Sequence, residues 1–415
     1  MSTRIRKSPF ELRLAFAPNA FSMKAMPGHE LVDLKSLGLI LPMQGGALGY
    51  NDQGGVITKT SDGRDISGLW DEFQSVVAIY NERRQKLVDL LTYSVTQNIE
   101  DVPQLASDDF EEASEFGEPK GIRAALTYFS MAYDFKWYDL AARFTWKFLA
   151  EASASQVEAI HQSALEADSR LVFKKVMSSI FNNVTRGATI NGQNYNVYPL
   201  YNNDGTIPPP YKGTVFDGTH THYLSSGAAL IDSGDLETMY GHLKHHGYSI
   251  ENGTTVVAML NSVDATEVKK FRANVVNNNS TTAVYDFVPA VGQPGLIVPN
   301  VNGLLGSQPA NTFQGFTVIG SYGNILIVEE DYIPAGYVLM FGSGGDGDLQ
   351  NVVGIREHAN PELRGLRLIG GDKQGYPLID SYYNRGFGTG IRQRGAAVVM
   401  RISASAYAVP AAYNA

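Results

Sequence analysis

Two stretches of alternating apolar and polar residues, 93–102 and 124–138, place the strongest constraint on the fold. In the second stretch, large apolar side chains recur at every other position, which is the period of a β-strand. These side chains are Phe129, Met131, Tyr133, Phe135 and Trp137. Paired as a hairpin, the two strands would reach roughly 30 to 50 Å at about 3.3 Å per residue. Because an isolated two-stranded ribbon is marginally stable in water, its apolar face needs a surface to cover it.

The segment between the two strands, residues 103–123, predicts an acidic and flexible tip. Glycine and proline interrupt it, and acidic side chains outnumber basic ones. The acidic residues are Asp108, Asp109, Glu111, Glu112, Glu115 and Glu118. In an arbitrary protein such a ribbon most often joins a sheet of its own chain. The acidic tip and the helices predicted on both sides favour a neighbouring subunit as the covering surface.

Helical periodicity flanks this hairpin. Between residues 67 and 95, apolar side chains fall at spacings near three and four after Ser67, a candidate N-cap. They are Leu69, Phe73, Val76, Tyr80, Leu87 and Leu90. The second helix is predicted over 155–181, opening with a capping box of Ser155 and Glu158. At about 1.5 Å per residue it would be roughly 40 Å long, well over twice the average helix length.

The rest of the chain divides by composition. Residues 1–66 are irregular and glycine-rich, which is typical of an extended arm. Residues 186–300 are polar, and asparagine, glycine and proline separate short elements, so we expect a separate mixed lobe. From residue 312 onward, stretches rich in valine, isoleucine, phenylalanine and tyrosine predict strands.

The overall composition excludes several classes of protein. The 42 acidic and 33 basic side chains give a net charge of −9, which disfavours a protein whose main task is to grip a phosphate backbone. No cysteine is present, so a disulfide framework and a thiolate zinc site are excluded, and a reducing cytoplasm fits. Glu11 and Arg13 interrupt the first apolar run, so we expect no export. No stretch of the sequence is long and apolar enough to predict a membrane-spanning helix.

Five of the eight histidines lie between residues 218 and 249 and raise the question of a metal site. His220 and His222 alternate, a spacing that can chelate a metal from one face. The cupin pattern would require a glutamate four residues after the second histidine, and that position is Ser226. This pair therefore lacks a central ligand.

The second histidine pair lies in a predicted helix over 235–246. His242 and His246 are one turn apart, as in the zincin motif, but Leu243 occupies the position of its general-base glutamate. Imidazoles in a last turn also favour the negative end of the helix dipole, and Gly247 supplies a left-handed cap. We therefore expect no metal, no cofactor and no catalytic residue here.

Glycine-rich segments suggest turns and not ligand sites. The sequence "GFGTG" at 386–390 resembles part of a dinucleotide fingerprint, but a strand pattern follows it, and no helix N-terminus is available for a pyrophosphate. The sequence "GSGGDGD" at 342–348 lacks the further ligands of a calcium loop. Both are predicted to be turns.

A group of arginines near the end of the chain complements the acidic tip. They are Arg364, Arg367, Arg385, Arg392 and Arg394. The acidic net charge and the lack of a recognisable nucleic-acid-binding motif favour a protein partner over nucleic acid. The alternative, arginines that only face solvent, is equally common for surface charges. We predict inter-subunit contacts for these arginines, for Phe129 and Phe135, and for five of the tip acids. These five are Asp108, Asp109, Glu111, Glu112 and Glu115.

The order of elements resembles the major capsid proteins of tailed bacteriophages with the Hong Kong 97-type fold. The stretches "FDGTHTHYLSSGAALIDSGDLETMYGHLKHHGY" and "ANPELRGLRLIGGDKQGYPLIDSYYNRGFGTGIRQRGAAVVMRI" are similar to segments of capsid proteins from phages of actinobacteria. The similarity covers most of residues 65–405. It implies an α+β fold with an N-terminal arm at 1–66, a helix leading into the extended loop at 67–92, the extended loop at 92–138, a peripheral domain with its spine helix at 139–185, an axial domain at 186–325, and a return to the peripheral domain at 326–415.

The resemblance implies a structural protein, not an enzyme, that self-assembles through pentamers and hexamers into an icosahedral shell enclosing double-stranded phage DNA. Its partners would be copies of itself, portal, scaffolding or decoration proteins, and DNA bound without sequence specificity, with no membrane involved. The expected location is the virion capsid, assembled in the cytoplasm of the host bacterium. Two alternatives remain open: an encapsulin-like nanocompartment shell enclosing enzyme cargo, and a metal-dependent enzyme using His220, His222, His242 and His246.

Overall fold

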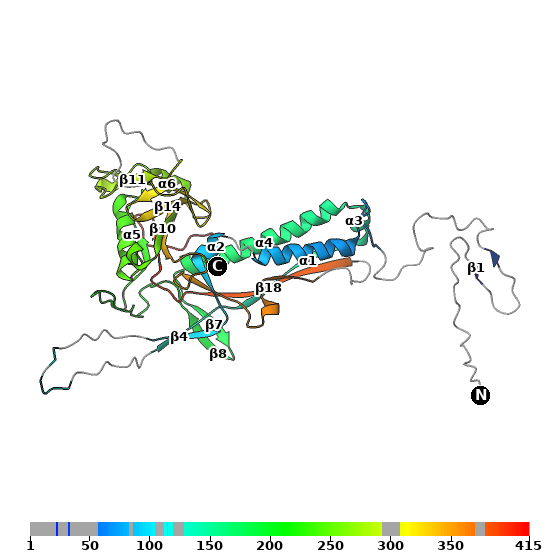
Figure 1. Ribbon diagram of the computed structural model, residues 1–415, viewed down its shortest axis with the longest axis horizontal. Helices are drawn as coiled ribbons and strands as arrows, with labels where there is room; N and C mark the ends of the chain where they lie inside the picture. Colours follow the sequence, from blue (N-terminus) through cyan, green and yellow to red (C-terminus); the bar gives the residue numbers. More distant parts are fainter. Residues whose placement is uncertain are drawn as a thin grey trace.

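The computed structural model describes residues 22–23, 32–33, 57–82, 86–103, 112–113, 115–118, 128–292, 308–369 and 378–414. Its helices are α1 (Ile66–Glu82), α2 (Lys86–Leu91), α3 (Trp146–Glu151), α4 (Ala154–Phe181), α5 (Ser233–His245) and α6 (Ser262–Val268), with short 3-10 turns at Ile250–Asn252, Asn278–Ser280 and Pro361–Leu363. Helices α1 and α4 lie side by side and extend from a lobe of strands that carries α5 and α6 (Figure 1). In the ranges that the structure describes, no helix has the length and apolarity to span a bilayer.

The strands form three large sheets and one small pair. The pair is β1 (Ser22–Met23) with β2 (Val32–Asp33). The eight-stranded sheet contains β9 (Tyr223–Ser225), β10 (Thr255–Leu260), β11 (Phe287–Pro289), β12 (Thr312–Phe313), β13 (Phe316–Tyr322), β14 (Ile325–Glu329), β15 (Tyr337–Ser343) and β19 (Ala397–Arg401). The five-stranded sheet contains β3 (Thr92–Val95), β6 (Lys136–Thr145), β16 (Val353–Arg356), β17 (Leu366–Ile369) and β18 (Leu378–Gly390). The four-stranded sheet contains β4 (Ile99–Pro103), β5 (Tyr128–Ala132), β7 (Arg186–Ile190) and β8 (Gln193–Val197).

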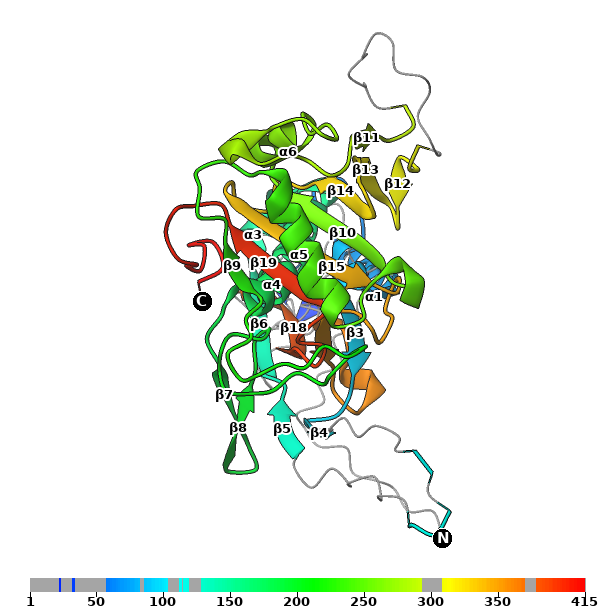
Figure 2. The ribbon, with the colours of Figure 1, turned by 90° about the vertical axis from the view of Figure 1, so that its left-hand side faces the viewer.

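The eight-stranded sheet is buried on both faces, and β10 shows why its sequence is apolar throughout. Because successive side chains of a strand point to opposite faces, Val257 and Met259 pack into a core shared with α4, whereas Val256, Ala258 and Leu260 pack with α5 and α6. Figure 2 shows α5 lying across the face formed by β15 and β19. The sheet takes strands from both sides of residue 325, where the sequence analysis placed a domain boundary.

Helices α1 and α4 cover the five-stranded sheet. The buried stripe of α1 consists of Leu69, Trp70, Phe73 and Val77. The predicted stripe used Val76 in place of Val77, but Val76 is 41% exposed and Val77 is 5% exposed. The prediction was wrong at this turn. Both residues are valine, so the sequence does not distinguish them, and the rotation of the packed helix about its axis determines which valine is buried.

The long helix is confirmed, and its N-terminus lies slightly earlier than predicted. At about 1.5 Å per residue, the 28 residues of α4 extend roughly 42 Å. The N-cap is Ser153, whose N–H donates to Oε1 of Gln156 at 2.9 Å. The predicted cap of Ser155 and Glu158 is therefore wrong; Glu158 instead pairs with Arg64 at 3.2 Å.

The predicted hairpin is confirmed at its base, but the surface that covers this base belongs to the same chain. Strand β4 pairs with β5 from Ile99↔Ala132 to Pro103↔Tyr128. Met131 and Tyr133 are fully buried, and β6 pairs with β18 over ten positions. The expectation of a neighbouring subunit was therefore wrong for this part of the ribbon. Most of the tip predicted at 103–123 lies outside the described residues.

The sequence "GFGTG" is part of β18 and not a turn, which corrects the prediction. Its three glycines share one face of the strand, where the base of the hairpin crosses closely. A Cβ on Gly388 would lie 2.7 Å from the backbone nitrogen of Phe135, and one on Gly390 would lie 3.0 Å from the carbonyl oxygen of Ala132. Glycine is needed here because another backbone occupies the space of a side chain.

Candidate functional site

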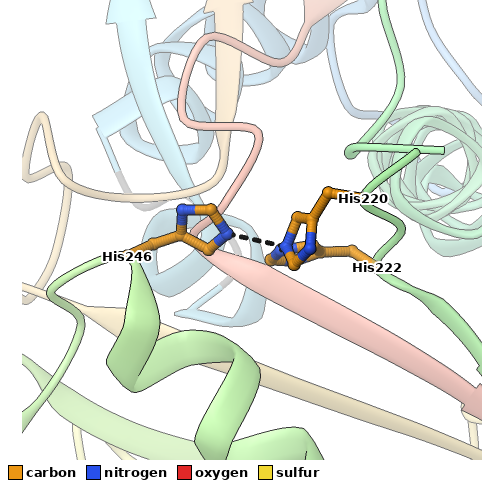
Figure 3. Close-up of side chains that lie close together, drawn as sticks. All are labelled: His220, His222 and His246. Atoms are coloured by element: carbon orange, nitrogen blue, oxygen red, sulfur yellow. Dashed lines mark hydrogen bonds between the residues drawn. The ribbon is translucent and has the colours of Figure 1, made fainter. Parts of the chain in front are cut away.

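Three histidines from distant parts of the chain converge on one point (Figure 3). His220 and His222 lie in the irregular segment that leads into β9, and His246 follows the last turn of α5. The Nε2 atom of His220 is 3.1 Å from Nε2 of His222 and 3.0 Å from Nε2 of His246. One ring nitrogen from each residue lies within 4.8 Å of the other two. Of the four histidines in the metal-site alternative, the structure brings the ring nitrogens of His220, His222 and His246 together, and His242 is not part of this group.

Local geometry explains how His246 reaches the cluster. Gly247 has a φ of +88° and ends the helix, as predicted, with the N–H of Gly247 donating to Lys244 and that of Tyr248 to Leu243. The imidazole of His246 points away from the helix carbonyls and stacks between two aromatic rings. The ring centroids are 5.6 Å away for Tyr201 and 4.5 Å away for Phe216.

The neighbours of His222 fix its protonation. His222 is fully buried, and its Nδ1 lies 2.6 Å from the carbonyl oxygen of Ala397. Because a carbonyl oxygen can only accept, Nδ1 carries the proton and Nε2 presents a lone pair to the cluster. No local pattern could predict this contact, because 175 positions separate the two residues.

The imidazoles are neutral at physiological pH. Burial, together with the neighbouring histidines, lowers the pKa of His220 to about 4 and that of His246 to about 3. Burial also holds the pKa of His222 well below its ordinary value. The physical cause is that a buried imidazolium loses its hydration and is repelled by positive charge on the neighbouring histidines.

Two of the predicted contact arginines act inside the subunit. Arg394 is 1% exposed and donates to Oδ2 of Asp204 at 2.6 Å and to the carbonyl oxygen of Pro199 at 2.8 Å. Arg385 pairs with the buried Asp168 at 2.5 Å and retains 13% of its side-chain exposure. Because the side chain of Arg394 is buried, the prediction that it contacts another subunit was wrong. Its hydrogen bonds instead hold the segment around Pro199 within the same chain.

The other predicted arginines retain exposed surface. Arg392 is half exposed and lies 3.4 Å from Glu100. Arg364 is partly exposed and donates to the carbonyl oxygens of His358 and Ala359. Arg367, in β17, is also partly exposed.

The structure describes part of the acidic tip. Asp108, Asp109 and Glu111 lie outside the described residues, as does the side chain of Phe129. Glu112 and Glu115 are exposed. Beside them Phe116 is 93% exposed, a contact candidate that the sequence analysis missed although an apolar residue among six acidic ones was a visible signal.

Phe135 is partly buried at the base of the hairpin. Its ring meets Trp137 edge to face at 5.4 Å, and the guanidinium of Arg356 lies 4.5 Å from its centroid. Trp137 itself is 45% exposed. This pair therefore offers an aromatic edge at the surface of the five-stranded sheet.

Comparison with known proteins gives one firm relationship. No family model and no curated protein matches the chain. A solved structure from Mycobacterium phage Patience shares 50% sequence identity, covering 90% of this chain and 97% of that chain, with a TM-score of 0.71. More distant matches are the capsid of an empty GTA particle, at 13% identity and a TM-score of 0.42, and the mature capsid of bacteriophage PhiM1, at 9% and 0.43. Each covers 77% of this chain, with 91% and 87% of the respective other chain. These two are too distant to add to the first.

Proposed function

The chain belongs to the Hong Kong 97-type major capsid proteins of tailed bacteriophages and has a structural role; from this premise we propose that it assembles through pentamers and hexamers into an icosahedral shell around double-stranded DNA. The observation that carries the proposal is the 50% identity to the Mycobacterium phage Patience chain over 90% of this one. Identity at this level over nearly a whole chain keeps the same core and the same exposed elements in place.

Exposed apolar side chains support repeated contact between subunits. Val76 and Ile79 lie one turn apart on the outer side of α1 and are 41% and 50% exposed. Trp137 and Leu140, on opposite faces of β6, are 45% and 43% exposed. Each of these exposed areas is small, so a single contact would be weak. In a closed symmetric shell many such contacts act together, and the assembly becomes stable.

The acidic net charge suits a wall that surrounds DNA without binding it tightly. A net charge of −9 opposes strong attachment to phosphates, so packaged DNA would remain free to move. We extend the proposal to assembly in the host cytoplasm and to portal, scaffolding or decoration proteins as further partners. Contact with DNA would carry no sequence specificity.

For the hairpin tip we propose an electrostatic partner on a neighbouring subunit. The acids at positions 108–115 would face Arg364, Arg367 and Arg392, which retain exposed surface. Arg385 is left out of this set because its side chain is only 13% exposed and pairs with the buried Asp168, whereas Arg392 is half exposed beside Glu100. Ion pairs at a rim of this kind set register and association rate more than affinity.

Microscopy of the untagged full-length chain tests the shell. We expect capsomer rings or uniform polyhedra by negative stain, with pentamers and hexamers after image averaging. A monomer that stays dispersed at all concentrations, by light scattering, would contradict the proposal. Shells from infected cells should also contain nuclease-protected DNA; shells filled with protein and free of nucleic acid would favour the nanocompartment alternative.

A charge swap tests the partner of the tip. Glu111→Lys, Glu112→Lys and Glu115→Lys together should reduce assembly yield and weaken its dependence on salt. Reversing the partner as well, with Arg364→Glu, Arg367→Glu and Arg392→Glu, should restore part of the yield. Equal yields in all variants, or no recovery in the combined variant, would show that the tip binds elsewhere.

A further inference from the structure

We propose that His220, His222 and His246 bind one divalent transition-metal ion, with zinc as the reference ion, and that this ion clamps the lobe of the eight-stranded sheet. The inference concerns a single subunit and does not depend on shell formation. No thiolate is available in a chain without cysteine, so the donor set is three imidazoles with a fourth position open to water.

The distances between the nitrogens suit a shared ion. Zinc binds imidazole nitrogen at about 2.0–2.1 Å, so two ligands of a tetrahedral site lie about 3.3 Å apart. His220 lies at 3.1 and 3.0 Å from its two partners, and all three nitrogens fall within 4.8 Å. The third pair, His222 and His246, is at most 4.8 Å apart, so it would close by up to about 1.5 Å when an ion binds.

Proton counting also favours an ion over hydrogen bonds alone. Nε2 of His222 presents a lone pair, because Nδ1 of that ring donates to Ala397. Nε2 of His220 contacts this lone pair and also Nε2 of His246, yet a neutral ring nitrogen carries at most one proton. A single proton on His220 cannot point at both partners, whereas one metal ion accepts a lone pair from each of the three rings.

The surroundings hold the rings in place before any ion arrives. The contact with Ala397 is the outer hydrogen bond that metal-bound histidines commonly make, and it fixes the ring of His222. The ring of His246 is held between Tyr201 and Phe216. Gly395 permits this packing, since a Cβ at that position would lie 2.7 Å from Cγ of His246.

A fourth histidine supplies an independent observation. The ring of His242 stacks on that of His220, with centroids 5.3 Å apart. Its Nδ1 is buried and has no hydrogen-bond partner within the described part of the chain. A buried polar atom without a partner is costly, and a water molecule bound to the ion in the fourth position would offer one.

The electrostatics permit a cation. An imidazole binds a metal through the lone pair of its unprotonated ring nitrogen, and Nε2 of His222 presents such a lone pair to the cluster. The guanidinium of the buried Arg394 lies over the ring of Tyr201, one of the two rings that pack on His246. The carboxylate of Asp204 neutralises the charge of Arg394. An ion here would not face an uncompensated positive charge.

The ion would join two parts of the lobe that are distant in sequence. His220 and His222 lie in the segment 198–222, which has little regular structure and leads into β9 at the edge of the sheet, and His246 lies at the C-terminus of α5. In the structure, ring stacking and hydrogen bonds are the interactions that hold these parts together at the cluster. A bound ion would therefore raise the thermal stability of this lobe and the order of the irregular segment.

Zinc binding to the purified full-length, untagged protein tests the site. After chelator treatment and dialysis against zinc alone, elemental analysis should find one zinc ion per chain. Cobalt in place of zinc should give the intense visible absorption of a tetrahedral site. The melting temperature should rise with zinc and fall again with chelator.

Matched variants separate this site from adventitious binding. His222→Gln and His220→Asn should each lower zinc affinity at least tenfold and abolish the thermal shift. His245→Ala, an exposed position in the same last turn of α5, should change neither. If His222→Gln fails to fold, the more peripheral His220→Asn still decides. Less than one zinc per five chains in the parent, or equal binding in parent and His220→Asn, would overturn the inference.

Discussion

Replacing Gly388 with alanine should loosen the base of the hairpin without removing any contact. Gly388 lies in β18 where the turn between β5 and β6 crosses it. An added Cβ would lie 2.7 Å from the nitrogen of Phe135 and 2.8 Å from the carbonyl carbon and oxygen of Asp134. These are backbone atoms, which cannot turn aside as the end of a flexible side chain can.

The magnitude follows from the displacement. Ordinary contacts of a Cβ begin at 3.4 Å, so the crossing backbone must retreat by about 0.6–0.7 Å. Overpacking of this kind costs about 1–3 kcal/mol. The shift would also stretch the hydrogen bond from the N–H of Asp134 to Thr389, which adds about 1 kcal/mol. Reduced freedom of the unfolded chain returns about 0.4–1 kcal/mol. The net loss is about 1–3.6 kcal/mol, which lowers the melting temperature by roughly 2–7 °C at about 2 °C per kcal/mol, the low end expected of a large chain.

Thermal and urea denaturation of the unassembled subunit, followed by circular dichroism, measures this loss. Gly187→Ala is the matched control, because Gly187 also lies in a strand, has an ordinary φ and has nothing within 4 Å of an added Cβ. The control should be neutral or slightly stabilising. If Gly388→Ala melts within 1 °C of the parent, the close crossing does not hold the hairpin base and the reasoning fails.

Three further predictions concern stability, pH and assembly. Asp168→Ala leaves the guanidinium of Arg385 buried without its carboxylate, so we expect a loss of about 3–5 kcal/mol in urea denaturation; a loss under 1 kcal/mol would refute the pairing. Burial raises the pKa of Asp235 to about 6, so the stability it contributes is complete below pH 3.8 and is lost as the pH rises through 6. Asp235→Asn should therefore be more stable than the parent at pH 8, by about 1–3 kcal/mol, and equal to it below pH 3.8; the same gap at both pH values would contradict this. Phe116→Ser should lower assembly yield and leave the melting temperature of the unassembled subunit unchanged, because the ring is 93% exposed there; a lower melting temperature with normal assembly would show that the ring packs within its own chain.

Local patterns in the sequence predicted the elements well where one face of the element repeats over several turns. The long helix ends at Phe181, as predicted, and Gly247 caps α5 with a positive φ. The strands of the last hundred residues also lie where branched and aromatic residues cluster. Each of these features depends on residues within a few positions of one another, so the sequence alone contains their cause.

Choices between equivalent neighbours needed the packed structure. Ser153 caps α4 instead of Ser155, although both are serines followed three residues later by a residue able to complete the box. Val77 is buried and Val76 is not. In each case the free-energy difference arises from what the rest of the fold places beside the helix, and no local preference separates the alternatives.

The sequence by itself determined the periodic elements, the absence of thiol chemistry and the resemblance to a shell-forming family. The tertiary structure decided where the hairpin base finds its cover, why "GFGTG" must be glycine-rich within a strand, and which histidines meet. The physical reason is separation along the chain: His220 and His246 are 26 positions apart, and Asp204 and Arg394 are 190 positions apart. Such pairs acquire their distances only after the sheets fix their register and α5 packs across them, so no local pattern can encode the contact.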